Sequence, residues 1–157
     1  MENKLKTYIG VKMLCATMMT LGEYNKLQGW TIPENEDPEA EGYLVVYPDG
    51  YKSWSPKEAF EAAYLELEDP SKISQSEVVK MFDVAEVNQL DEKTTHVKCE
   101  TLTGFVQHEV SSCVDPKNYD EKIGAEIASK RIHDKLWGHL GFVLQWAKYG
   151  LKSKCPK

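Results

Sequence analysis

The sequence has no long apolar run and no segment that resembles a membrane anchor. Its 157 residues are 41% hydrophobic and 28% charged, which is typical of a soluble globular protein. A transmembrane helix needs about 20 consecutive apolar residues, and no run here approaches that length. The first eight residues also lack the apolar core of a secretory signal peptide. We therefore expect a cytoplasmic protein that does not bind a membrane.

Cysteine is scarce, and its spacing argues against both disulfides and a metal centre. The four cysteines form no C-x-x-C pair, which favours reduced thiols. His96 and Cys99 lie three residues apart on a predicted strand, so they should face opposite sides of it. Zinc ligands usually come in closer pairs. We expect no metal site and no cofactor.

A catalytic motif is also missing. Cys113 lies near His108 and Asp115 in the sequence, and these residue types can form a nucleophile, a base and an orienting acid. No nucleophile-elbow sequence surrounds Cys113, however. A cysteine at a strand end is more often a small buried apolar residue. The sequence therefore favours a protein that is not an enzyme.

Charge is unevenly distributed and suggests two modules. Residues 1–70 contain 6 Lys and 13 acidic residues, whereas residues 71–157 contain 13 basic and 12 acidic residues. The boundary should lie at Asp69-Pro70-Ser71, where Pro and Ser stop a helix. The net charge of −6 argues against duplex nucleic acid as a partner, because such binding neutralises many phosphates. A small anion needs only a few local cations.

The first module, residues 1–70, should be a small αβ unit. Thr20, Glu23 and Gly29 carry the capping signals of a short helix over 20–28. Residues 8–17, 43–47 and 51–54 have strand character, residues 48–50 form a turn, and Ser55-Pro56 should open a second helix. The module is rich in Trp and Tyr, which either fill its small core or stack on a base.

The second module, residues 71–157, should be a helix, a β-hairpin and a long helix, which makes the whole protein α+β. We predict a helix over 74–87 and strands over 95–102 and 105–111 around a Thr103-Gly104 turn. Asp115-Pro116 should open the long helix, with a bend or break at Gly138 or Gly141. Apolar positions at helical spacing predict the buried sides of the two helices: Val78, Val79, Phe82 and Val87, then Ile123, Ile127, Ile132, Leu136 and Leu140.

Several cations and hydroxyls lie between the helix predicted over 74–87 and the hairpin that follows it. Lys93, Thr94, Thr95 and Lys98 together have the residue types that hold a phosphate. The alternative is a solvated connector without a ligand. Lys130 and Arg131 lie on the long helix, where they are also placed for i,i+4 ion pairs.

The second module resembles a known family over residues 74–146. The resemblance rests on an ordered run of short motifs: Gly104-Phe105, Cys113-Val114-Asp115-Pro116, Asn118-Tyr119-Asp120, Ile123-Gly124, Ile127-Ala128, Lys135-Leu136-Trp137 and Leu140-Gly141-Phe142. It is similar to the small phage sponges that block cyclic-oligonucleotide (anti-CBASS) immune signalling and are related to a sponge of Thoeris signalling. The first half resembles a small phage and prophage module through YIGVK, EYN, GWTIP, EGYLV and SWSPKEAF.

The resemblance implies an oligomer of helix–hairpin–helix protomers that binds cyclic dinucleotides between subunits without cleaving them. By position, Phe82, Lys93 and Thr95 would contact the ligand, with Lys98 beside them. Lys130 or Arg131 would serve a second anion site. The expected function is therefore capture of cyclic di- or trinucleotide immune messengers in the host cytoplasm. The alternative is a protein-binding module that engages a host defence protein, with the hairpin half serving only oligomerisation.

Overall fold

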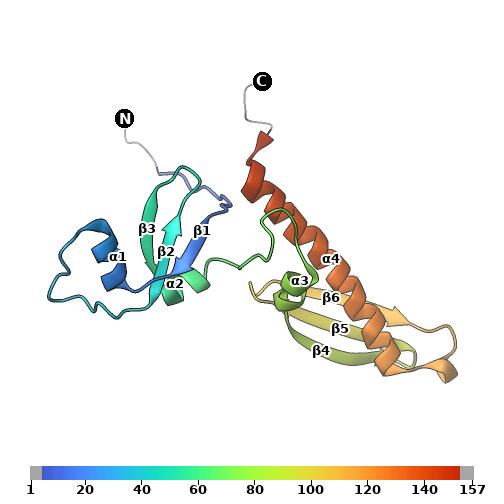
Figure 1. The fold of residues 1–157 in the computed structure, drawn as a ribbon. Coiled ribbons are helices and arrows are strands. Elements are labelled where there is room, and N and C mark those ends of the chain that lie inside the picture. The colour runs from blue at the N-terminus through green and yellow to red at the C-terminus, as the bar shows by residue number, and fades with distance from the viewer. Residues whose placement is uncertain (1–4, 153–157) are drawn as a thin grey trace. The chain divides into compact units, whose positions relative to one another are not determined.

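The computed structural model describes residues 5–152, which form two units (Figure 1). One unit contains residues 5–66 together with 146–152, and the other contains Leu67–Gln145. Each unit has its own three-stranded antiparallel sheet, with the orders β1-β2-β3 and β4-β5-β6. The predicted α+β class is confirmed. Cys15, Cys99 and Cys113 carry free thiols, and Cys155 lies outside the described residues.

The first unit consists of short elements around its sheet. They are, in chain order, β1 (Cys15–Met18), α1 (Leu21–Gln28), β2 (Gly42–Val46), β3 (Lys52–Pro56) and α2 (Lys57–Glu61). The predicted first helix is confirmed with its caps. Thr20 and Glu23 form a capping box, and Gly29 ends the helix with φ 72°. The predicted turn at 48–50 is also present, with Gly50 at φ 87°.

Two expectations for this unit were wrong. The first strand covers only Cys15–Met18, the segment that pairs with β2. Ser55 does not cap α2: Ser55 and Pro56 belong to β3, where they pair with Tyr43 and Gly42. Pro56 is the last residue of β3, which is an edge strand of its sheet. At such a position the missing backbone N–H of proline costs little stability. Cross-strand pairing therefore outweighed the local capping signal.

The second unit is a helix, a three-stranded sheet and a long helix. Its elements are α3 (Gln75–Met81), β4 (Phe82–Asp91), β5 (Thr94–Thr101), β6 (Val106–Ser112), the 3-10 turn η1 (Pro116–Asn118) and α4 (Glu121–Tyr149). Side chains of α4 contact the sheet along its length: Arg131 Nη1 donates to the Val110 carbonyl, and Lys135 pairs with Glu109. The buried faces of β5 and α4 supply the core: Val97, Cys99, Ala128, Ile132, Leu136 and Leu140.

The helix predicted over 74–87 was wrong in its second half. It ends at Met81, and Phe82 begins a ten-residue strand that pairs antiparallel with β5. Phe82 is therefore a strand residue, and Val79 and Val87 are 53% and 41% exposed instead of buried. The apolar spacing fitted a helix. The backbone of this segment instead forms its hydrogen bonds as a β-strand, by pairing with β5.

The long helix also begins and continues differently from the prediction. Asp115 caps η1 by accepting from the Lys117 backbone N–H at 2.9 Å, and α4 begins only at Glu121. The Asp120 carboxylate accepts from the Ile123 N–H at 3.1 Å and so caps α4. The helix then runs unbroken through Gly138 and Gly141, contrary to the expected bend or break. Of its predicted stripe, Ile132, Leu136 and Leu140 are buried, whereas Ile123 and Ile127 are 56% and 41% exposed.

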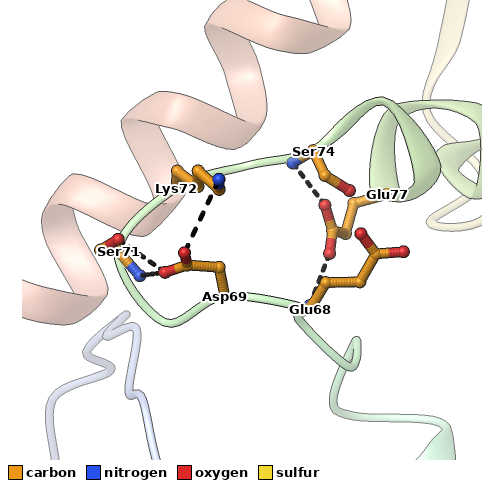
Figure 2. A network of polar contacts seen from close by, with 6 residues as sticks. All are labelled: Glu68, Asp69, Ser71, Lys72, Ser74 and Glu77. Atoms are coloured by element: carbon orange, nitrogen blue, oxygen red, sulfur yellow. Dashed lines mark hydrogen bonds and ion pairs between the residues drawn. The ribbon is translucent and has the colours of Figure 1, made fainter.

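A buried carboxylate attaches the segment before α3 to the helix (Figure 2). Glu77 is fully buried and accepts hydrogen bonds from the backbone N–H groups of Glu68, at 2.8 Å, and Ser74. The Ser74 and Glu68 hydrogen bonds lower the pKa of Glu77 to about 2, against an ordinary value of 4.5. Beside it, Asp69 accepts from Ser71 and pairs with Lys72. The loop before α3 is therefore shaped by carboxylates that satisfy backbone donors.

Replacing Glu77 should destabilise the second unit. Glu77→Gln removes the charge from two backbone hydrogen bonds and should cost ~2 kcal/mol. Because the folded pKa lies below the unfolded value, the stabilisation is complete above about pH 4.5 and is lost as the pH falls towards 2. Thermal unfolding from pH 7 to pH 2 measures this difference. Glu68→Gln is the matched control, because Glu68 contributes its backbone N–H, and its exposed carboxylate forms no ion pair with a described residue. Equal melting temperatures for both variants at pH 7 would contradict the assignment.

Candidate anion-binding pocket

A small pocket with several polar lining residues lies in the second unit, where the sheet meets the start of α4. Its volume is about 190 Å³. The β4–β5 turn, the ends of β5 and β6, η1 and the first two turns of α4 form its walls. The lining residues are Lys93, Thr95, Ser111, Ser112, Cys113, Asn118, Tyr119, Asp120, Ile123, Gly124 and Ile127. One cation, one carboxylate, several hydroxyls and an amide therefore converge there with an apolar edge from α4.

The turn that carries Lys93 is held from both sides. The Asp91 carboxylate accepts from the Lys93 N–H at 2.9 Å, and this bond and one with the Thr94 side chain lower the pKa of Asp91. The Lys93 carbonyl accepts from the Cys113 N–H at 3.0 Å, which joins the turn to the end of β6. Thr94 and Ser112 share a hydrogen bond of 2.8 Å. The backbone of Lys93 is thus fixed, and Lys93 is an exposed residue that lines the pocket.

The floor of the pocket depends on a close approach between β5 and α4. Thr95 is fully buried, and its hydroxyl donates to the Tyr119 hydroxyl at 3.1 Å. Gly124 lies directly above: a Cβ there would be 2.4 Å from Thr95 Oγ1. Only glycine permits this spacing. Tyr119 is half-buried between the two elements, which places its ring in the pocket wall.

Two of the six predicted ligand residues meet in this pocket, and four lie elsewhere. Lys93 and Thr95 line it. Lys98 lies on the opposite face of the sheet and pairs with Glu86 at 3.1 Å, because residues an odd number apart on a strand face opposite sides. Phe82 packs against His133, with ring centroids 4.6 Å apart, instead of lining the pocket.

The two cations predicted for a second anion site already have protein partners. Lys130 pairs with Asp134 at 2.9 Å, one turn along α4. Arg131 donates to the Val110 carbonyl at 2.6 Å. They are neighbours in sequence, but they make separate contacts and do not line this pocket.

Sequence reasoning missed most of the pocket wall. Ser111, Ser112, Asn118 at the end of η1 and Tyr119 just after it were not predicted as ligand contacts. For Asn118 and Tyr119 the sequence offered one indication: the motif Asn118-Tyr119-Asp120 comes one residue after the predicted cap at Asp115-Pro116. Without the 3-10 turn, however, those residues fall on a continuous helix and point in different directions.

The residues considered for catalysis or metal binding are not assembled. The Cys113 thiol donates to the Asp115 carbonyl at 3.2 Å, whereas His108 stacks on His96 on the other face of the sheet, with Nδ1 of His108 2.8 Å from Nε2 of His96. Burial raises the pKa of the Cys99 thiol. Within residues 5–152, no three or more His, Cys, Asp or Glu side chains are grouped to hold a metal ion. The described helices also include none that is long and apolar enough to cross a membrane.

This helix–sheet–helix unit with a polar pocket is the part of the chain that comparison with known proteins recognises. Residues 69–147 match the Phage protein (N4 Gp49/phage Sf6 gene 66) family. The chain belongs to this family. The matched range contains α3, the whole second sheet and all the pocket residues. Neither the curated proteins nor the solved structures give a match.

Adding a side chain at Gly124 should close the pocket floor. Gly124→Ala places a methyl group against Thr95 Oγ1 and should destabilise the protein by about 1–3 kcal/mol, despite the better helix propensity of alanine. Gly138→Ala is the matched control on the same helix, because a Cβ there meets nothing within 4 Å. It should stabilise by ~0.5–1 kcal/mol. Chemical denaturation measures both, and a neutral Gly124→Ala would contradict the close approach.

Proposed function

We propose that this phage-family protein captures cyclic nucleotide immune messengers in the host cytoplasm and holds them without cleaving them. The observation that carries the proposal is the meeting of Lys93, Thr95, Ser111 and Tyr119 in one pocket. An ammonium group and hydroxyl donors are suited to a phosphate, and a tyrosine ring is suited to a base. Membership of a phage family supports a role during infection.

The carboxylates around the pocket do not argue against an anion. Asp91 and Asp115 accept from the backbone N–H groups of Lys93 and Lys117, and Asp120 accepts from that of Ile123. Asp91 and Asp115 do not line the pocket, and Asp120, which does, accepts from the Ile123 amide. Lys93 forms no ion pair with a described carboxylate, in contrast with Lys98 and Lys130. Its ammonium group remains available to a phosphate.

The size of the pocket supports a ligand shared between two subunits. Its volume of about 190 Å³ is below the ~300–1,000 Å³ of pockets that enclose a drug-sized ligand. A cyclic dinucleotide has two phosphates and near two-fold symmetry, so two copies of the pocket related by a two-fold axis would each hold one half. Ile123 and Ile127 form an exposed apolar edge beside the pocket. Contact between two such edges would bury them and close the site.

Loss of the Lys93 ammonium group should weaken nucleotide capture. Calorimetry with a panel of cyclic di- and trinucleotides measures the affinity directly. Lys93→Ala should bind the nucleotide about tenfold to a hundredfold more weakly, because it loses a charge-assisted hydrogen bond to the phosphate. Lys117→Ala is the matched control, because Lys117 lies on η1 and does not line the pocket. Ligand recovered after denaturing the complex should be intact. No binding across the panel, or recovery of cleaved nucleotide, would refute the proposal.

The oligomer should depend on the apolar edge of α4. Ile127→Lys puts a charge into the proposed contact between subunits and should lower the mass measured by light scattering after size-exclusion chromatography. Leu90→Lys is the control, because Leu90 is 60% exposed but does not line the pocket. A wild-type protein that is monomeric with and without ligand would contradict the shared site.

A further inference from the structure

The first unit contains a larger pocket of a different character. Its volume is about 450 Å³, within the range of pockets that hold small ligands or side chains. The rings of Tyr24, Trp30 and Trp54 supply much of its wall, and Pro33 and Glu36 from the loop after α1 supply another side. Neither a Lys nor an Arg lines it. The nucleotide proposal makes no use of this pocket.

The aromatic walls are held in place by contacts of their own. Tyr24 is buried and meets Trp30 edge to face, with centroids 6.0 Å apart and planes at 84°, which forms a right-angled corner. Trp54 donates its Nε1–H to the Met19 carbonyl at 2.8 Å. Its ring lies against Gly42, where a Cβ would be 2.4 Å from Trp54 Cζ2. Trp30 is 60% exposed, so one wall of the corner is open to solvent.

The loop beside the pocket is strongly acidic and fixed against α1. Its backbone is tied by hydrogen bonds from the Leu21 N–H to the Ala40 carbonyl, at 3.0 Å, and from the Gly22 N–H to the Pro38 carbonyl, at 2.9 Å. Of its carboxylates, Glu41 pairs with Lys57 at 2.7 Å, and Glu36 forms no ion pair with any described residue. The acidic residues of the loop are Glu34, Glu36, Asp37, Glu39 and Glu41.

We propose that this pocket receives a Lys or Arg side chain from a basic segment of a partner protein. Aromatic faces attract a cation through their quadrupoles, and a nearby carboxylate strengthens the attraction. The negative loop disfavours phosphate ligands for the same electrostatic reason. The acidic residues continue past the pocket along the loop, so they complement further basic residues of the same segment. A basic peptide fits this arrangement better than a free small cation does.

Calorimetry of the full-length protein with capped tetra-arginine and tetra-lysine peptides tests the proposal. Binding should weaken as salt is raised. Trp30→Ala should weaken it about tenfold, and Trp30→Phe should retain most of it, because an aromatic face remains. Glu36→Gln should weaken it several-fold. Glu34→Gln makes the same charge change on the same loop outside the pocket, and it should have a much smaller effect. Capped tetraglutamate should not bind.

Several results would overturn the proposal. Equal losses for Glu36→Gln and Glu34→Gln would show that the peptides bind by net charge alone. Unchanged binding by Trp30→Ala, with folding verified by circular dichroism, would show that the aromatic corner is not used. Absence of binding by both basic peptides at low salt would also refute it. Cyclic nucleotide binding by the Trp30 variants should be unchanged, so this inference and the nucleotide proposal fail separately.

Discussion

The close approach of α4 to β5 at Gly124 determines the geometry of the second unit. Because Gly124 has no side chain, the helix lies against Thr95, and Thr95 in turn donates to Tyr119. This brings η1 and the end of β6 around the Lys93 turn. The buried stripe from Ala128 to Leu140 holds the rest of α4 on the sheet. A side chain at position 124 would therefore clash with Thr95, on which the pocket floor depends.

Polar side chains in this unit satisfy the backbone at the places where elements begin. Glu77 caps α3 and also binds the N–H of Glu68, and Asp115 and Asp120 cap η1 and α4. These carboxylates shape the chain between the regular elements. Of these carboxylates, that of Asp120 lines the pocket together with Lys93, whereas Glu77 and Asp115 do not line it.

The two units present pockets of opposite electrostatic character. The first has aromatic rings and a carboxylate from an acidic loop, with no Lys or Arg, and the second has an ammonium group, a carboxylate, hydroxyls and an amide. These sets of groups favour ligands of opposite charge. Family membership covers only the second unit, residues 69–147. The two proposals therefore assign ligands of different chemistry to the two units.

Local signals in the sequence determined the α+β class, the capping box of Thr20 and Glu23, the glycine turns and the cap at Asp115, because each depends on residues within one turn of chain. They also indicated Lys93 and Thr95 as neighbours at the hairpin entry. Only the tertiary structure decided that residues 82–91 form a strand, since the partner that satisfies their backbone is β5. Because of the same pairing, Lys98 lies on the opposite face of the sheet from the pocket, where it pairs with Glu86. Phe82 packs against the His133 ring instead of lining the pocket. The pocket wall from β6 and η1 likewise required long-range packing, because no periodicity in one segment specifies which other segment will lie beside it.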